Sequence, residues 1–296
     1  MDFKKVLCGS RRYNFHTHTQ FCDGHATMEQ MAAAAVEQGF THIGFTPHSP
    51  LAIESPCNMS KSDVPLYLAE LRRLERLYVN RCRFYAGMEI DYLSDAWGPH
   101  ITYFRELPLD FRIGSVHFIP TKDGRTAIDM DGRPERFAQR LREYFDNDLR
   151  YVVNTFFSQT RRMILAGGFD IIGHLDKIGH NASAVQPGIE NEHWYRRRAD
   201  EIVDLVISRG ITVEINTKAY EQTAPADDPG HPFGAPEGEG RIFPSRRLIS
   251  RLKAAGVPII VNSDAHSPER LQSGRDAAFM MLDALPARIS APDAVE

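Results

Sequence analysis

The sequence has 296 residues, and 35 Lys and Arg against 39 Asp and Glu give it a formal net charge of −4. This slightly acidic balance argues against nucleic acid as a partner, because a nucleic-acid-binding domain is typically basic. No apolar run approaches the ~20 residues that a membrane span requires, so no membrane partner is expected either.

The cysteines and the N-terminal residues indicate a cellular compartment. The four cysteines have no C-x-x-C spacing and are too few for a disulfide framework. The first residues contain two lysines and lack the apolar segment of a secretory signal. We therefore expect reduced thiols and a cytoplasmic protein.

Short apolar runs alternate along the chain with longer amphipathic stretches. The runs that predict strands are residues 13–15, 42–45, 84–88, 111–116, 169–173, 211–215 and 257–261. The stretches that predict helices are residues 27–37, 63–78, 133–144, 151–165, 190–208, 244–255 and 267–285. Strands that alternate with helices predict a parallel sheet, because parallel neighbours need a crossover connection.

Nearly every predicted strand ends in His, Glu or Asp. A closed barrel brings the carboxyl ends of all its strands together on one face, whereas an open sheet would spread seven of them over ~30 Å. We therefore expect an α/β fold with a TIM-like, seven-stranded (β/α)7 barrel formed by residues 1–296 as one domain. Residues 222–240, rich in Gly, Pro and acidic residues, predict a loop inserted over that face.

The residues at these strand ends predict a metal centre. His16-Thr17-His18 is the strongest local pattern, because residues i and i+2 of a strand point to the same side and both imidazoles can reach one ion. The last predicted strand is followed by a similar pair, Asp264 and His266. The other candidate ligands are His25, His48, Glu89, His117 and His174. Together they are too many for one tetrahedral ion and suit two or three.

These motifs resemble the PHP (polymerase and histidinol phosphatase) superfamily. The resemblance is carried by His16-Thr17-His18, Thr46-Pro47-His48, Gly87-Met88-Glu89, Ser115-Val116-His117, Gly173-His174 and Asp264-Ala265-His266. Within the superfamily, residues 15–25, 114–120, 169–176 and 213–217 are similar to the histidinol-phosphatase branch. The similarity extends from Asn14 to Glu269, in the expected order.

The resemblance implies a distorted (β/α)7 barrel with three divalent ions at the C-terminal face of its strands. It implies one ion held by His16, His18, Glu89 and Asp264, a second by Glu89, His117 and His174, and a third by His25, His48 and His266. Glu89 would bridge two ions, and Asp23 would either bind an ion or orient a histidine ligand. Zn, Fe and Mn all suit this set of ligands.

The implied activity is hydrolysis of L-histidinol phosphate to L-histidinol and phosphate, a step of histidine biosynthesis. Three divalent ions, two carboxylates and a bridging hydroxide leave a charge of about +3, which suits a phosphate monoester. We expect the metal-bridging hydroxide to attack phosphorus directly, and Asp264 or His266 to protonate the leaving group. The partner is then a small phosphate ester.

Other residues are candidates for contact with this substrate. Arg161 is the expected phosphate contact, because the branch often has arginine there, and Ser115 and His180 are further candidates. Acids that could face the ammonium and imidazole of histidinol are Glu54, Asp91 and Asp95. The insertion at residues 222–240 would cover the site or lie at the interface of a homo-oligomer.

Three other functions are compatible with parts of the pattern. A PHP phosphoesterase acting on another small phosphate or a nucleic-acid end would share the metal ligands, although a basic stripe for nucleic acid is absent from residues 120–134 and 222–240. A catalytically silent PHP module would lack some of the ligands, and here every ligand position is filled. An amidohydrolase-type barrel usually has a bridging lysine where this sequence has Glu89.

Overall fold

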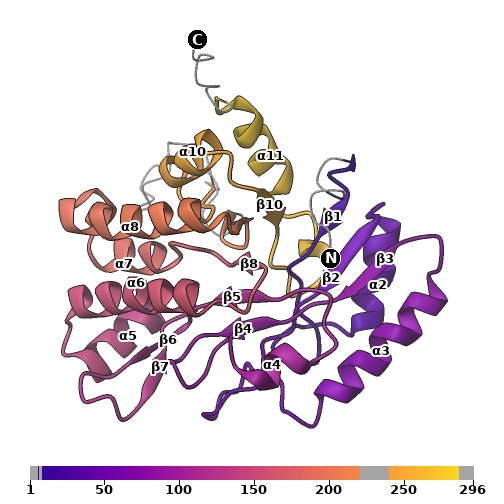
Figure 1. The fold of residues 1–296 in the computed structure, drawn as a ribbon, viewed down its shortest axis with the longest axis horizontal. Coiled ribbons are helices and arrows are strands. Elements are labelled where there is room, and N and C mark those ends of the chain that lie inside the picture. Colours follow the sequence, from indigo (N-terminus) through magenta and orange to yellow (C-terminus); the bar gives the residue numbers. More distant parts are fainter. Residues whose placement is uncertain (1–5, 7–8, 221–239, 287–296) are drawn as a thin grey trace, which may run out of the picture.

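The computed structural model describes residue 6, residues 9–220 and residues 240–286. The strands lie in the middle of the molecule, with α6, α7 and α8 together on one side and α2 and α3 on the other (Figure 1). The insertion expected at residues 222–240 lies, except for Gly240, outside the described residues. No helix in the described part of the chain is both long and apolar enough to cross a membrane.

The strands form two parallel sheets and one hairpin. The first sheet has the order β1 (Tyr13–Asn14), β2 (His42–Phe45), β3 (Arg83–Ala86). The second has the order β10 (Ile259–Asn262), β9 (Thr212–Asn216), β8 (Ile171–Ile172), β5 (Ile113–Ser115), β4 (Glu89–Asp91). The antiparallel hairpin consists of β6 (Phe118–Pro120) and β7 (Ala127–Asp129).

Helices connect and cover these strands. They are α2 (Met28–Glu37), α3 (Val64–Leu77), α4 (Thr102–Glu106), α5 (Pro134–Phe145), α6 (Leu149–Ala166), α7 (Ile178–Val185), α8 (His193–Arg209), α10 (Arg246–Ala254) and α11 (Arg275–Ala284). Two 3-10 helices, η1 (Ile189–Asn191) and η2 (Pro268–Arg270), complete the described elements. Two of these helices begin at residues that favour a helix start: Thr27 and Gln30 form a capping box at the start of α2, and Pro65 lies in the first turn of α3.

All seven apolar runs are strands of the two parallel sheets, which confirms the α/β class. The closed seven-stranded barrel is not confirmed, because neither sheet closes on itself within the described residues. The chain changes partner just after the run at residues 84–88: β3 ends at Ala86 and pairs with β2, whereas β4 begins at Glu89 and pairs with β5. The strands on either side of Gly87 and Met88 therefore belong to different sheets.

The two sheets meet beyond the carboxyl ends of β1, β2 and β10 and at the first residue of β4. Isolated parallel bridges join Thr17 to Ala265 and His48 to Glu89. The backbone N–H of His18 donates to the carbonyl of Ala265 at 2.8 Å, and that of Ser49 donates to the carbonyl of Glu89 at 2.8 Å. These contacts bring the segments after β1, β2 and β10 to the start of β4.

A packed aromatic layer lies next to these segments. Phe15 and Phe111 are fully buried, and their rings meet edge to face with centroids 5.7 Å apart. The Phe111 ring lies directly against the backbone of Gly44 and Gly87, where a Cβ atom would approach it to 2.5 Å. Phe15 and Gly87 lie next to the ligand candidates His16 and Glu89, so this packing supports the ligand-bearing backbone.

We expect Gly44→Ala to destabilise the protein. The added methyl group would overlap Phe111 and come within 3.1 Å of Phe15 in a layer that has no spare room. Overpacking of this kind costs about 1–3 kcal/mol, which urea unfolding would measure. Gly9→Ala is the matched control, because no atom lies within 4 Å of its added Cβ. Equal stability of the two variants would contradict this interpretation.

Candidate metal centre

Glu89, the first residue of β4, has a carboxylate that is 1% exposed and surrounded by histidines. Its Oε2 atom lies 3.1 Å from His48 Nδ1, 3.2 Å from His16 Nε2 and 3.5 Å from His18 Nε2. Its Oε1 atom lies 2.9 Å from His174 Nε2 and 3.5 Å from His117 Nε2. Five of the expected ligands therefore meet at the sixth, Glu89.

Asp264 provides a second buried carboxylate beside the same histidines. Its Oδ1 atom lies 3.1 Å from His18 Nε2 and 3.7 Å from His16 Nε2. The residue has φ of +52°, in the left-handed region that Asp adopts more readily than most non-glycine residues. This turn directly precedes Ala265, which forms the bridge to Thr17, so the local backbone keeps the Asp264 side chain at the ligand cluster.

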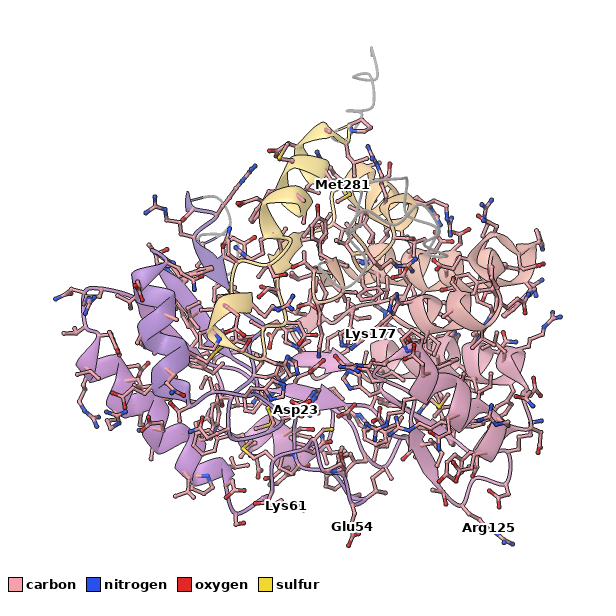
Figure 2. All side chains as sticks on the ribbon, turned by 180° about the vertical axis from the view of Figure 1, so that it is seen from behind. Asp23, Glu54, Lys61, Arg125, Lys177 and Met281 are labelled. Carbon is pink, nitrogen blue, oxygen red and sulfur yellow. The ribbon has the colours of Figure 1, made fainter. Side chains whose placement is uncertain are left out.

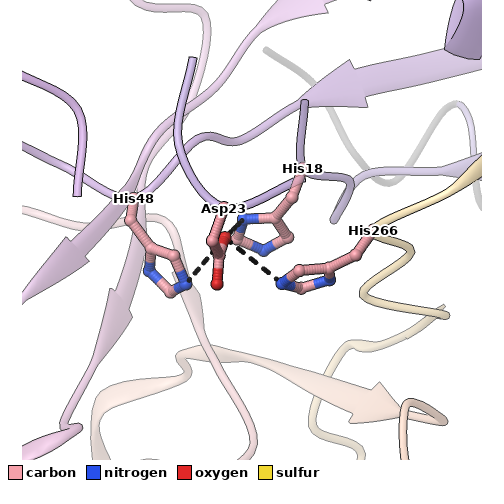
Figure 3. A group of neighbouring side chains, drawn as sticks. All are labelled: His18, Asp23, His48 and His266. Atoms are coloured by element: carbon pink, nitrogen blue, oxygen red, sulfur yellow. Dashed lines mark ion pairs between the residues drawn. The ribbon is translucent and has the colours of Figure 1, made fainter. Parts of the chain in front are cut away.

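Asp23 joins a third set of side chains (Figure 3). Its Oδ1 atom lies 3.4 Å from His266 Nε2, 3.7 Å from His18 Nδ1 and 3.8 Å from His48 Nε2. Unlike Glu89 and Asp264, the Asp23 side chain is 29% exposed, so this set lies on the solvent side of the cluster. Figure 2 also places Asp23 in the central part of the molecule.

The described residues form three groups whose ligand atoms lie within 4.8 Å of one another. The groups are His16, His18 and Asp264; then His48, Glu89 and His117; and then His18, Asp23, His48 and His266. The first matches part of the expected first site. In the second, His48 stands where His174 was expected, although His174 still contacts Glu89. In the third, Asp23 stands where His25 was expected.

His25 is not brought into any of these groups. The residue is exposed, and its backbone N–H donates to the carbonyl of His266 at 2.7 Å. The loop between β1 and α2 thus turns the Asp23 side chain toward the cluster and leaves the His25 side chain outside it.

Several atoms that face one another in the cluster are buried without a hydrogen-bond partner. They are His16 Nε2, His18 Nε2, His48 Nδ1, Asp23 Oδ1, Glu89 Oε2 and Asp264 Oδ1. Buried polar atoms are normally paired, because leaving them unpaired costs free energy. Imidazole nitrogens and carboxylate oxygens that converge in this way fit divalent cations, which would bind all of them at once.

The side of several rings that faces away from the cluster is held by a second contact. His16 Nδ1 lies 2.7 Å from Glu214 Oε1, and His117 Nδ1 lies 2.6 Å from Asp91 Oδ1. Such contacts fix ring orientation and direct the other nitrogen toward an ion. Glu214 had no predicted role, and Asp91 was expected to face the substrate. Asp91 lies two residues after Glu89 on β4, on the same side of the strand.

The other two acids proposed for the substrate lie elsewhere. Asp95 forms an ion pair with Arg162 and accepts a hydrogen bond from the hydroxyl of Tyr92. Glu54 is exposed and lies at the outer edge of the molecule (Figure 2).

The electrostatics of the site favour ionised carboxylates. Burial alone would raise the pKa of Glu89, but the facing His16, His48 and His117 lower it well below its usual range. Burial likewise opposes ionisation of Asp264, and Lys218 and His16 lower its pKa well below the ordinary value. These carboxylates are therefore in the form that binds cations.

The histidines respond to the same field in opposite ways. Burial lowers the pKa of His18 well below its ordinary value, and the neighbouring His266 and His48 lower it further. Burial also opposes a charge on His16, but Glu214, Asp264 and Glu89 raise its pKa. The raised pKa of His16 reflects the negative potential that a divalent cation would meet at this position.

The three residues proposed for substrate binding lie in different environments. Ser115 is buried, and its hydroxyl donates to Glu89 Oε1 at 2.7 Å. His180 is buried on α7, where burial and the nearby Arg241 lower its pKa to about 4. Arg161 is exposed on α6, and no described hydrogen bond or ion pair links it to the three ligand groups.

Two lysines that the sequence analysis did not select lie near the cluster. Lys218 follows β9, and its Nζ atom lies 3.1 Å from His266 Nε2 and 3.4 Å from Asp264 Oδ1. Lys177 follows β8 and forms an ion pair with Asp131 at 2.6 Å. Both positions come shortly after a strand end, which is the signal by which they could have been selected.

Comparisons with known proteins agree with this architecture. A family model described as the PHP domain matches residues 14–218. The probable histidinol-phosphatase of Deinococcus radiodurans is 28% identical over 274 residues, which cover 88% of this chain and 87% of that protein. A solved structure from Listeria monocytogenes is 18% identical with a TM-score of 0.72, covering 90% of this chain and 99% of that chain.

A second solved structure is similar over nearly the whole chain. It is the histidinol phosphate phosphatase of Lactococcus lactis subsp. lactis in complex with zinc, L-histidinol and phosphate. It is 20% identical to this chain with a TM-score of 0.66, covering 94% of this chain and 95% of that chain. The two solved structures thus share the fold described above.

We expect Glu89→Gln to lose tightly bound divalent metal. The neutral amide removes the negative charge at the centre of the cluster and can place an N–H against histidine nitrogens whose lone pairs would bind the cation. Elemental analysis after gel filtration would measure the metal content of each chain. Glu70→Gln, which alters a partly exposed acid paired with Arg73, is the control. A full metal complement in Glu89→Gln would show that Glu89 is not a bridging ligand.

Proposed function

Since the chain belongs to the PHP domain family, we propose that it is a metal-dependent phosphatase that hydrolyses L-histidinol phosphate to L-histidinol and phosphate. The observation that carries the proposal is the convergence of three ligand groups around the buried carboxylates of Glu89 and Asp264. The proposal is supported by the complex of the Lactococcus lactis relative with zinc, L-histidinol and phosphate.

Three divalent ions are proposed around the three ligand groups. His18 and His48 each belong to two groups, and each neutral imidazole would bind one ion through its unprotonated nitrogen. Zinc is favoured by the relative just named, and the mixed nitrogen and oxygen ligands also suit iron and manganese. His174 is proposed as a further ligand because it lies 2.9 Å from Glu89 Oε1. Ligation by His25 stays a prediction, since a change in the loop would be needed to bring its ring to the cluster.

Bound divalent ions would lower the pKa of water toward ~7 and offset the negative charge of phosphate oxygens. The proposed reaction is a direct in-line attack of hydroxide on phosphorus, with no covalent intermediate on the protein. The role of Glu89 and Asp264 is to hold fixed negative charge inside the cluster. Of Asp264 and His266, the two candidates to protonate the leaving alkoxide, His266 is favoured, because the lowered pKa of Asp264 keeps that carboxyl group ionised. Ser115 holds Glu89 in place through its hydrogen bond.

Lys218 is the proposed contact for the phosphate group. Its Nζ atom is within 3.4 Å of both Asp264 Oδ1 and His266 Nε2. Its side chain is 28% exposed, whereas that of Asp264 is 2% exposed, so the ammonium group is on the side from which a substrate would approach. Lys177 adds positive charge near the cluster. Burial lowers the pKa of His174, and the charge of Lys177 lowers it further.

We expect Lys218→Met to lower kcat/KM for histidinol phosphate by about 10- to 100-fold. A hydrogen bond to a charged group contributes about 1.5–3 kcal/mol, and each 1.36 kcal/mol corresponds to about a tenfold change in rate. Arg161→Ala provides the comparison, because Arg161 is the phosphate contact that the family resemblance favours. Steady-state kinetics of both variants decide between them: a loss confined to Arg161→Ala would refute the role of Lys218.

The substrate itself is tested by phosphate release from a small panel of compounds. The panel contains histidinol phosphate, an aryl phosphate, a nucleoside monophosphate and short single-stranded DNA, each with added Zn or Mn. We expect a strong preference for histidinol phosphate that a chelator abolishes. Weak activity on all four compounds would still indicate a metal-dependent phosphoesterase, but it would refute the assignment of histidinol phosphate as the substrate and of a role in histidine biosynthesis.

Several broader expectations stay predictions. They are the closed seven-stranded barrel, a single domain over residues 1–296, a cytoplasmic location and a homo-oligomer.

A further inference from the structure

Glu214 is a fully buried carboxylate in β9 that belongs to none of the three ligand groups. It lies two residues before Asn216 on the same side of the strand, and it is 2.7 Å from the ring of His16. A buried acid is costly unless its charge is compensated and its oxygen atoms accept hydrogen bonds. The partners of Glu214 therefore indicate what it does.

Both oxygens of Glu214 are fully used. Oε1 lies 2.7 Å from His16 Nδ1 and accepts a hydrogen bond from Asn262 Nδ2 at 2.9 Å. Oε2 accepts from the backbone N–H of His174 and from Asn216 Nδ2, each at 3.1 Å. An ionised carboxylate offers about four lone-pair sites, so no further donor can be accommodated without displacing one of these.

These four donors come from different strands. His16 follows β1, His174 follows β8, Asn216 ends β9 and Asn262 ends β10. Two of them connect onward: Asn216 Nδ2 also donates to Asp264 Oδ2 at 3.1 Å, and Asn262 Oδ1 accepts from the backbone N–H of Phe15 at 2.8 Å. Glu214 thus links the backbone segments that carry His16, His174 and Asp264.

The contact with His16 also determines which ring nitrogen can bind a cation. Three other N–H donors already face the two oxygens of Glu214, so its carboxylate acts as the acceptor in each of these contacts. The Nδ1 atom of His16 then carries the proton in the hydrogen bond that it shares with Glu214 Oε1. With the proton at Nδ1, the Nε2 atom can present a lone pair to Glu89 and Asp264, and it has no hydrogen-bond partner of its own.

We propose that Glu214 is a positioning residue for the metal centre, which holds His16 with Nδ1 protonated and Nε2 directed at the ion bound by His16, His18 and Asp264. This inference rests on the proposed function, since it assumes that the cluster binds divalent metal. Loss of such a partner of a metal ligand typically lowers metal affinity by about 10- to 100-fold.

Glu214→Gln is the decisive variant. Glutamine has nearly the same shape, but its amide group would present N–H to one of the donors that Glu214 now accepts from. We expect zinc titration against a competing chelator to show the dissociation constant of one ion raised by about 10- to 100-fold. In the zinc-loaded wild type, NMR of the 15N-labelled histidine rings should show His16 protonated at Nδ1, and this signal should be lost in the variant.

The control and a second variant separate positioning from general damage. Asp170→Asn removes a carboxylate that accepts a backbone N–H from Arg112 between β5 and β8, at the opposite end of the strands, and should bind zinc like the wild type. If Glu214→Gln does not fold, Glu214→Asp keeps the charge but is too short to retain all four contacts, and should show the same weakening of one ion.

The outcomes distinguish the two proposals. A wild-type protein that binds no zinc overturns the proposed function. If the Glu214 variant binds zinc as tightly as the wild type and shows the same His16 signal, only the positioning role is overturned. Equal weakening in Asp170→Asn also overturns it, because the effect would then reflect the sheet and not the contact with His16.

Discussion

The negative charge of Glu89 lies inside the protein with the rings of five histidines around it, and much of the structure serves to hold those rings there. A buried carboxylate requires positive partners or hydrogen bonds that make up for the lost water. The partners of Glu89 come from segments that follow β1, β2, β5 and β8, so the strands must end close together. The bridges from His48 to Glu89 and from Thr17 to Ala265 bring these strand ends together without closing either sheet.

The ligand cluster is supported from two sides. Below it, the rings of Phe15 and Phe111 pack against glycine backbone, which fixes where the strands end. Behind it, carboxylates on neighbouring strands contact the far nitrogens of the rings: Glu214 contacts His16, and Asp91 contacts His117. The pairing of the strands therefore determines how the rings of His16 and His117 are oriented. Asp23 and Lys218 lie on the exposed side of the cluster, where Lys218 is the proposed contact for the phosphate group.

The parts of the fold and site that could be predicted are those that depend on periodicity. Alternation of side chains along a strand places His16 and His18 on one side, and each of the seven apolar runs contains residues of a strand. The strands β4, β6 and β7 lie outside these runs. Sheet closure could not be predicted, because the chain passes from one sheet to the other between β3, which pairs with β2, and β4, which pairs with β5, and no periodicity marks this change. The conformation of the loop after β1 could not be predicted either. This loop directs Asp23 toward the ligand cluster and leaves His25 exposed, and no periodic pattern in the sequence indicates which of the two would face the cluster. Glu214 was overlooked because a single acid within an apolar strand gives no sign of the four donors that meet it.

The most direct test is the number of divalent ions that one chain retains. Native mass spectrometry of the wild-type protein, after zinc is added and excess zinc is removed, counts them without reference to any substrate. We predict three zinc ions per folded chain and their release when the chain unfolds. A folded chain that retains no zinc would contradict the central claim, because protons and internal contacts alone would then stabilise the buried carboxylates of Glu89 and Asp264.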